Sequence, residues 1–441
     1  MSNKKDKKAL WVATISASMA NYIDAGSIVA GAAGLSLWTT FLHMNNWQLG
    51  ILSAFSSNAV SAAIGALIGG KLCDKFGRKL IYNFSMLCYM VGILMIVFSQ
   101  NFPVFFIGYI IVGLSVGADI PASWTTIAEG APAENRARHC GSAQIAWSAG
   151  PIIVYILSVA LGGLGLLGSR LVFAHLFFVA LFTWILRRGV PESESWEAEK
   201  KREEQLLAEG KSLEKVSLKQ LFTFTNVKSM LFLIGVYLFW NLAAGTMGFF
   251  MPLIYQTVGK VSGQTANLLQ AGLFAITALG TYVVFMGMGD KISRRGIYAV
   301  SSIMAIGAWS IFILPSSSMK PYMLVIFVVI YGLSCGFGQQ PFYQLWSSEL
   351  FPTKYRGSAQ GVMFFVVRVA LGIWSFIVPT IMSKFGFQLA ASCMVGFLII
   401  SAIIGITFAP KTQGKTLEEI ERERYGSKEN NLDRKIANSI N

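Results

Sequence analysis

The chain has 441 residues, of which 54% are hydrophobic and only 13% are Asp, Glu, Lys or Arg. Soluble domains carry roughly 25% of these charged residues, so an aqueous protein of this composition would leave too much apolar surface uncovered. The composition therefore excludes an ordinary soluble protein, and lipid must form part of the solvent.

Twelve stretches along the chain are long and apolar enough to cross a hydrocarbon core, which takes about 20 residues. The first follows a cluster of lysines and carries Asn21 and Asp24, so we expect it to be retained and not cleaved as a secretory signal. We predict an all-α membrane protein with twelve transmembrane helices. The stretches are 9–33, 47–70, 80–99, 103–127, 140–166, 167–187, 229–257, 265–288, 297–315, 320–347, 357–384 and 387–409.

A highly charged stretch, 188–228, divides these spans into two groups of six. We predict an N-terminal bundle (1–187), a cytoplasmic linker with short helices (188–228), a C-terminal bundle (229–409) and a cytoplasmic tail (410–441). If both ends face the cytoplasm, 31 of the 36 Lys and Arg residues lie inside and four lie outside. This bias predicts that both termini are cytoplasmic. It also explains the net charge of +14 without nucleic acid. The outside loops carry no N-x-[ST] site, which suits the cell membrane of a bacterium.

The two halves carry the same charged signatures at their inner loops. Asp74 and Arg78 after span two correspond to Asp290 and Arg294 after span eight, and the pattern E-x-x-P-x-x-x-R recurs after spans four and ten. We predict that these charges pair across the cytoplasmic ends and close the carrier on that side, the alternative being that they only set topology. The predicted gate residues are Asp74, Arg78, Glu129, Arg136, Asp290, Arg294, Glu349 and Arg356.

Several motifs taken together resemble a known family. The loop 70–79 (GKLCDKFGRK) resembles the major facilitator signature G-x-x-x-D-[RK]-x-G-R-[RK], and the tail 410–421 (PKTQGKTLEEIE) is similar to the ending of sugar porters. The segments 191–196 (PESESW) and 22–26 (YIDAG), and the spacing of Arg136, Gln144 and Gly150, fit the same group. The resemblance implies two pseudo-symmetric six-helix bundles and a secondary transporter that works by alternating access.

Other positions depart from the sugar porters. These proteins carry a G-R pair at the start of span four, where this chain has Gly108 and Tyr109, and their span-seven Q-Q-x-x-G-x-N is absent here. The G-x-D-x-P at Asp119 and the in-span Arg368 resemble the organic-acid and phosphate symporters. The resemblance therefore implies import of a sugar or cyclic polyol such as myo-inositol by proton symport, with a carboxylate transporter as the alternative.

Three charged residues lie well inside predicted spans, away from the span ends: Asp24, Asp119 and Arg368. A charge at the centre of a membrane helix costs about 2.5–3.5 kcal/mol, so such residues usually mark an ion or substrate path. We predict that all three take part in proton coupling, with Asp24 at the position where sugar porters keep their acid. The alternative is that Asp119 and Arg368 form a structural salt bridge between the halves. His175 is a further titratable candidate.

Polar and aromatic side chains inside the spans are candidates for substrate contact. Amide donors and acceptors combined with aromatic planes suit a neutral polyhydroxylated ligand, although each could instead bond helix to helix. The candidates are Asn21, Gln144, Trp147, Trp240, Asn241, Gln339, Gln340 and Gln344, with Trp346 as another stacking face.

The sequence argues against other classes of membrane protein. The five cysteines are scattered, and no His, Cys and Asp/Glu set has catalytic or metal-ligand spacing, so we expect free thiols, no metal and no enzyme. No filter repeat or charged ring indicates a channel. We expect no cofactor besides the coupling proton, a small-molecule substrate, and a functional monomer in the bilayer. A sensor built on a transporter scaffold stays an alternative.

Overall fold

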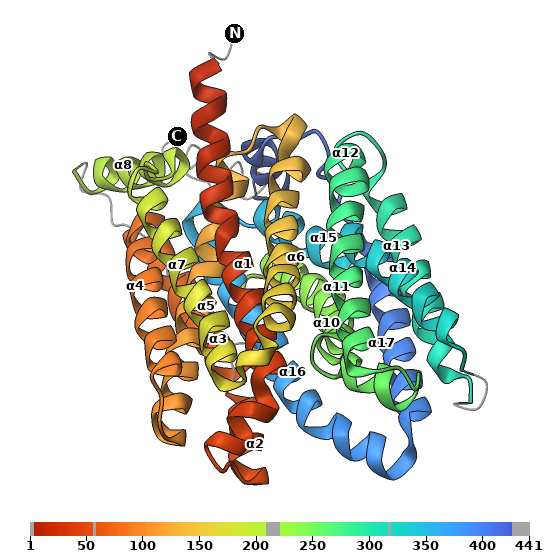
Figure 1. Cartoon of the computed structure of the whole chain (residues 1–441). Helices are drawn as coiled ribbons and strands as arrows, with labels where there is room; N and C mark the ends of the chain where they lie inside the picture. The colour runs from red at the N-terminus through yellow and green to blue at the C-terminus, as the bar shows by residue number, and fades with distance from the viewer. Residues whose placement is uncertain (1–3, 56–58, 209–220, 316–318, 426–441) are drawn as a thin grey trace.

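A computed structural model describes residues 4–55, 59–208, 221–315 and 319–425, and within these ranges all regular structure is helical. The long helices run side by side in one bundle (Figure 1). The first turns of α1 (Lys4–Phe41) and the whole of α8 (Glu194–Ala208) lie at the same end (Figure 1). We call this the charged end, because it also holds the gate residues.

The N-terminal half consists of seven helices. A capping box at Asn45 begins α2, and Asn101 caps α5 with Pro103 in its first turn. Gly77, at a φ of +91°, separates α3 from α4, a conformation that glycine adopts without strain. After α1 the helices are α2 (Asn46–Ala54), α3 (Val60–Phe76), α4 (Arg78–Val97), α5 (Phe102–Gly130), α6 (Arg136–Ala160) and α7 (Leu166–Arg188).

The C-terminal half repeats this plan. A 3-10 turn (Thr353–Tyr355) precedes α16 just as another (Ala133–Asn135) precedes α6, so the matching E-x-x-P-x-x-x-R motifs fold alike. A π-helical turn (Thr281–Phe285) joins α11 to α12. The helices are α10 (Phe224–Thr257), α11 (Gly263–Gly280), α12 (Met286–Met288), α13 (Arg294–Ser310), α14 (Pro321–Phe337), α15 (Gln339–Glu349), α16 (Arg356–Phe385) and α17 (Phe387–Phe408).

The helices account for the twelve predicted spans. Ten segments of the described ranges are long and apolar enough to cross a membrane, with α11–α12 and α14–α15 each counted once. The remaining two spans are α1, with 38 residues, and α3, with 17. The structure differs from the prediction in detail, because the predicted span 47–70 is divided between α2 and α3. The twelve-helix fold in two six-helix bundles is confirmed.

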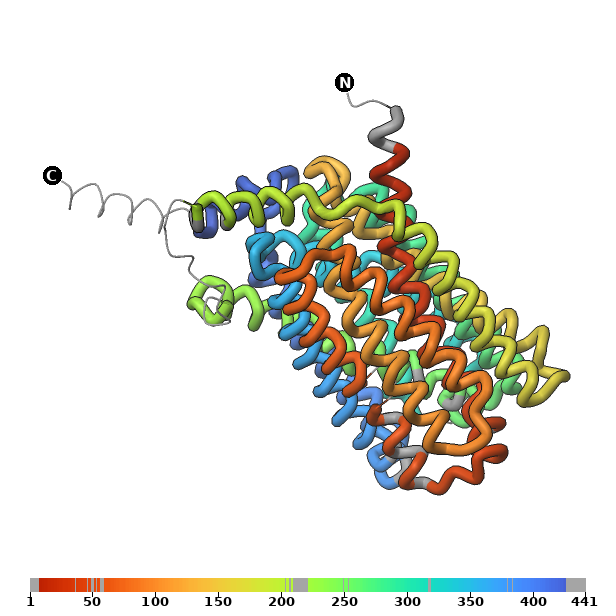
Figure 2. The backbone as a smooth tube through the Cα atoms, turned by 90° about the vertical axis from the view of Figure 1, so that its left-hand side faces the viewer, coloured from red at the N-terminus to blue at the C-terminus, as the bar shows by residue number. Residues whose placement is uncertain are grey.

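The two halves meet most closely where α3 packs against α16. A side chain at Gly70 would place its Cβ 2.2 Å from the carbonyl oxygen of Gly357, and one at Gly361 would come within 2.3 Å of the Ala66 carbonyl oxygen. Only glycine allows two helix backbones to approach this closely. Figure 2 shows the same long helices from the side, with α16 running next to the N-terminal half.

A buried ion pair ties the N-terminal half together. The Arg187 guanidinium, at the end of α7, lies 2.7 and 2.8 Å from the two carboxylate oxygens of Asp119 on α5. It also donates to the carbonyl oxygens of Ser16 and Ala17 on α1, and Ser85 on α4 donates to Asp119. Four helices are thus fastened at one point.

This contact overturns the alternative in which Asp119 and Arg368 form a salt bridge between the halves. Arg187 is the last residue of the predicted sixth span, where a basic residue is typical of a cytoplasmic boundary. In the structure its side chain is fully buried and points back into the bundle, where it neutralises Asp119. Asp119 therefore has a structural partner within its own half.

We predict that Asp119→Leu or Arg187→Met alone lowers the unfolding free energy by about 3–5 kcal/mol, because each leaves an uncompensated buried charge. The double variant should recover most of that loss. Thermal unfolding of the purified protein in detergent measures both. Glu423→Gln, which removes an exposed partner of Lys415, serves as the control and should change little. Equal losses in the single and double variants would contradict the pairing.

Candidate functional site

A pocket lies between the two halves, midway along the helices. Its volume is about 40 Å³. One water needs ~10–15 Å³ by the same measure, so the pocket holds only a few waters. A ring-sized ligand therefore requires the surrounding side chains or halves to move apart. The lining residues are Ala25, Ile28, Val29, Trp147, Pro151, Tyr237, Trp240, Asn241, Ala244, Gly245, Gly248, Phe274, Gln340, Arg368 and Leu371.

Several polar atoms in and around this pocket have no hydrogen-bond partner among the described residues. In the lining they are the Trp240 indole nitrogen and the Asn241 side-chain oxygen. On other helices that line the pocket, one side-chain amide atom each of Asn21, Gln144 and Gln344 also has no partner. All five side chains are buried. Burying such groups without a partner costs about 1–3 kcal/mol each. The set contains both donors and acceptors, as a hydroxylated ligand requires.

The structure divides the predicted substrate contacts into two groups. Trp147, Trp240, Asn241 and Gln340 line the pocket. The others are buried but are not part of the lining: Asn21, Gln144, Gln339, Gln344 and Trp346.

Two members of the second group have partners within the protein. The Asn21 side-chain oxygen accepts from the Trp124 indole at 3.1 Å, and Gln339 donates to Ser302 on α13 at 3.1 Å.

Asp24 and Arg368 face each other across the two halves. Arg368 Nη2, on α16, lies 3.7 Å from Asp24 Oδ2 on α1, and both side chains are buried. The Arg368 guanidinium also lies over the Phe364 ring, 4.5 Å from its centre. The basic partner of Asp24 thus comes from the opposite half and lines the pocket.

His175 lies away from this pair, within the N-terminal half. Its Nε2 is 2.7 Å from the hydroxyl of Tyr22, two residues before Asp24, and its Nδ1 lies 3.2 Å from the Val172 carbonyl oxygen. His175 does not line the pocket. Its contacts are those of a histidine that joins α7 to α1.

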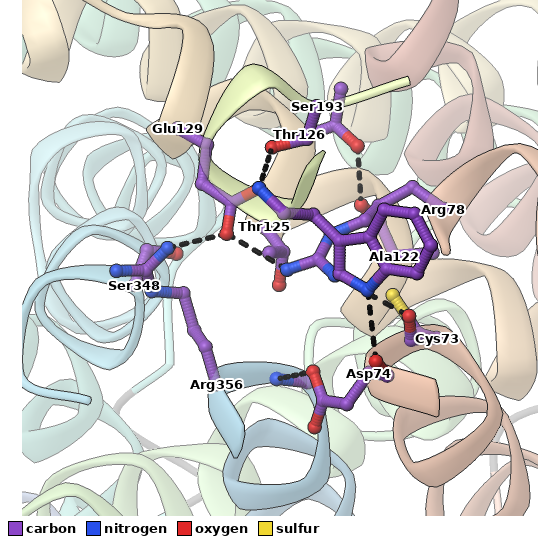
Figure 3. Close-up of polar contacts among 12 residues, drawn as sticks. Cys73, Asp74, Arg78, Ala122, Thr125, Thr126, Glu129, Ser193, Ser348 and Arg356 are labelled. Carbon is purple, nitrogen blue, oxygen red and sulfur yellow. Dashed lines mark hydrogen bonds and ion pairs between the residues drawn. The ribbon is translucent and has the colours of Figure 1, made fainter. Parts of the chain in front are cut away.

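At the charged end, Glu129 holds one arginine from each half (Figure 3). Its Oε1 lies 2.8 Å from Arg78 Nη2 in the N-terminal half and 2.6 Å from Arg356 Nη1 in the C-terminal half. The Ser193 hydroxyl donates to the other carboxylate oxygen. All three charged side chains are buried.

Asp74, beside this cluster, caps a helix of the other half. Its carboxylate accepts from the backbone N–H groups of Gly357 and Ser358, at 3.0 and 2.6 Å, in the first turn of α16 (Figure 3). The Trp196 indole donates to the Asp74 carbonyl oxygen. A carboxylate at a helix N-terminus is favoured by the unpaired N–H groups and by the helix dipole.

The second repeat builds the same arrangement with the halves exchanged. Glu349 lies 3.0 Å from Arg294 in its own half and 3.0 Å from Arg136 in the other. Asp290 accepts from the Ala137 N–H at the start of α6, at 3.0 and 3.2 Å, and pairs with Arg294. Burial raises the pKa of the Asp290 carboxyl, and the Arg294 charge opposes that shift.

The predicted pairing of the four arginines with Glu129 and Glu349 is therefore confirmed, while their gating role stays a prediction. Sequence reasoning did not single out the layer between the gate residues and the pocket. There Thr125 donates to Gln360 at 3.0 Å across the halves, and the Trp124 ring meets Tyr343 and Phe364 edge-on. In-span Gln360 was the available signal.

Comparisons with known proteins agree with this architecture. The model of the family described as "Sugar (and other) transporter" matches residues 36–423. The minor myo-inositol transporter IolF of Bacillus subtilis (strain 168) is 52% identical over 440 residues, covering 100% of both chains. The glucose transporter GlcP of Staphylococcus epidermidis is 27% identical over 428 residues, covering 88% of this chain and 93% of its own.

Among solved structures, the major facilitator superfamily proton:xylose symporter XylE bound to 6-bromo-6-deoxy-D-glucose aligns with a TM-score of 0.81. The alignment has 20% identity and covers 95% of this chain and 99% of that one. The matched family model and the full-length relative show that this chain belongs to the sugar (and other) transporter family, and its fold is that of a solved member of the major facilitator superfamily.

Proposed function

We propose that the protein imports a cyclic polyol, myo-inositol, together with a proton. The observation that carries this proposal is the set of buried, unpartnered donors and acceptors around a pocket lined from both halves. The named function of the relative that is 52% identical over the whole chain supports the choice of substrate. A site shared by two halves can face either side of the membrane in turn.

The electrostatics of the pocket favour a neutral ligand. Arg368 is its only charged lining residue among those described, and the Asp24 carboxylate 3.7 Å away offsets that charge. The indoles of Trp147 and Trp240 offer planes against which the C–H face of a ring can pack. The Asn241 and Gln340 amides and the Trp240 N–H then bind the hydroxyls.

The second candidate substrate is a carboxylate, and Arg368 is the observation that favours it. When Asp24 is protonated, the carboxylate charge that offsets Arg368 is lost. An anion entering at that stage would replace the lost partner. Voltage dependence separates the two candidates. A neutral ligand that enters with one proton moves net charge across the membrane, whereas a monocarboxylate that enters with one proton moves none.

Asp24 is the proposed proton carrier. It is the one buried carboxyl of the described residues that adjoins the pocket and has its basic partner in the other half. Protonation removes its attraction to Arg368, so binding of a proton weakens a contact between the halves.

We further propose that the charged end faces the cytoplasm of a bacterial cell, since the basic residues concentrate there. The pocket is built within one chain, which fits a functional monomer.

Asp24→Asn should abolish accumulation driven by a pH gradient but spare counterflow exchange, because the carrier can still reorient with ligand and lacks only the titratable group. Radiolabelled myo-inositol uptake into proteoliposomes measures both. Full pH-driven accumulation by Asp24→Asn would remove Asp24 from the coupling mechanism.

A potassium–valinomycin potential, negative inside, should drive accumulation of myo-inositol without any pH gradient. Moving one charge through 100 mV provides about 2.3 kcal/mol, equivalent to roughly a 50-fold gradient at about 1.4 kcal/mol per decade. A monocarboxylate entering with one proton is electroneutral and should ignore the potential. Accumulation that follows the pH gradient and ignores voltage would replace the polyol with the carboxylate.

The gate prediction uses two native thiols. Cys73 and Cys140 are fully buried beside the Glu129 and Glu349 clusters. Glu129→Gln and Glu349→Gln each weaken one link between the halves, so both should increase labelling of these thiols by a membrane-impermeant maleimide. The background should be Cys88→Ser/Cys393→Ser, which removes the two more exposed thiols.

Glu423→Gln, which alters an exposed pair at the same end, should leave the labelling rate unchanged. If Glu129→Gln and Glu349→Gln also leave it unchanged, the eight charges set topology and do not form a gate.

A further inference from the structure

The face of α10 that lines the pocket changes character along its length. Its lining residues recur at helical spacing. Those nearer the charged end are aromatic or polar, whereas those farther away are alanine and glycine. In order they are Tyr237, Trp240, Asn241, Ala244, Gly245 and Gly248. From Tyr237 to Gly248 the helix rises about 16 Å. One stripe of residues therefore lines both the polar part of the pocket, nearer the charged end, and the part lined by small residues, farther from it.

The two glycines in this stripe have different surroundings. A Cβ at Gly245 would lie 2.3 Å from Leu371 Cδ1, so Gly245 packs closely against that side chain of α16. Among the described residues, a Cβ at Gly248 would meet no atom within 4 Å, and the φ of Gly248 lies outside the region that favours glycine. Neither the described packing nor the backbone conformation explains a glycine at position 248.

A glycine in the interior of a helix costs about 0.5–1 kcal/mol relative to alanine. At Gly248 the missing side chain leaves space that belongs to the pocket. The buried, unpartnered Trp240 N–H and Asn241 oxygen lie on the same face, about two turns nearer the charged end. A ligand held by these polar groups would extend along the stripe toward Gly248.

We propose that Gly248 sets the upper size limit of the ligand. The space left by its missing side chain admits a six-membered ring, whereas a larger side chain there would restrict the pocket to short polyols. The inference rests on the proposed function and adds a specificity-determining residue to it. Ile28 and Val29 of α1 also line the pocket, so the part farther from the charged end is apolar and accepts the C–H edge of a ring. The hydroxyls of that ring then meet the amides and the indole nearer the charged end.

The test titrates this space with Gly248→Ala and Gly248→Val in the full chain. The probes are erythritol, xylitol, myo-inositol and an O-methyl inositol, measured by thermal stabilisation of purified protein and by competition with myo-inositol uptake. One methylene in a pocket changes discrimination by about 10–200-fold. Gly248→Ala should therefore raise the half-saturating concentration of myo-inositol about tenfold or more, and that of the O-methyl inositol further. Erythritol should change less than about twofold.

Gly307→Val on α13 and Gly396→Val on α17 are matched controls. Both glycines lie within helices, have no atom of the described residues within 4 Å of a Cβ position and are not part of the pocket lining. They should leave every half-saturating concentration unchanged, which separates pocket filling from a general effect of valine in a membrane helix.

Three outcomes are distinguishable. A graded loss that begins with the largest probe supports the inference. If wild-type protein binds the polyols but Gly248→Ala and Gly248→Val weaken all probes equally or none, the inference is overturned and the proposed function stands. If wild-type protein binds none of the polyols, the proposed function fails and the inference fails with it.

Discussion

The closed charged end depends on two carboxylates, each shared between an arginine of its own half and one of the other. Glu129 binds Arg78 and Arg356, and Glu349 binds Arg294 and Arg136. An isolated buried charge is unstable, so the remaining charges must find water or new partners when the halves separate. In the proposed gate, closure at this end is a discrete state held by paired charges, which is what a carrier with two alternating conformations requires.

Two helices connect this end to the pocket. α16 begins at the Asp74 cap and carries Arg368 twelve residues beyond Arg356, about 18 Å along its axis. α1 carries Asn21, bound to Trp124 of the intervening layer, and Asp24 three residues later. The proposed ligand and proton sites thus lie on the same two helices that run from the charged end to the pocket. A shift of α1 relative to α16 at the pocket changes the contact between the halves at both levels.

The sequence predicted the fold well because a membrane imposes helix length and the duplicated motifs mark equivalent loops. It predicted the pocket less well, because an amide in an apolar helix does not reveal which face it occupies. Gln339 and Gln340 are neighbours about 100° apart on a helix, and only Gln340 lines the pocket. Arg187 was missed because a basic residue at the end of a span reads equally well as a loop charge.

The position of Arg368 changes how proton binding can be linked to movement. Sugar porters carry an arginine at the position of Tyr109. In this chain Tyr109 packs against α1, with its hydroxyl 2.5 Å from where a Cβ of Gly31 would lie. The positive charge that faces Asp24 belongs instead to α16 in the other half. A partner in the same half would move with Asp24 as a rigid body and leave the interface unchanged. With the partner in the opposite half, the protonation state of Asp24 enters directly into the energy of separating the halves around the pocket.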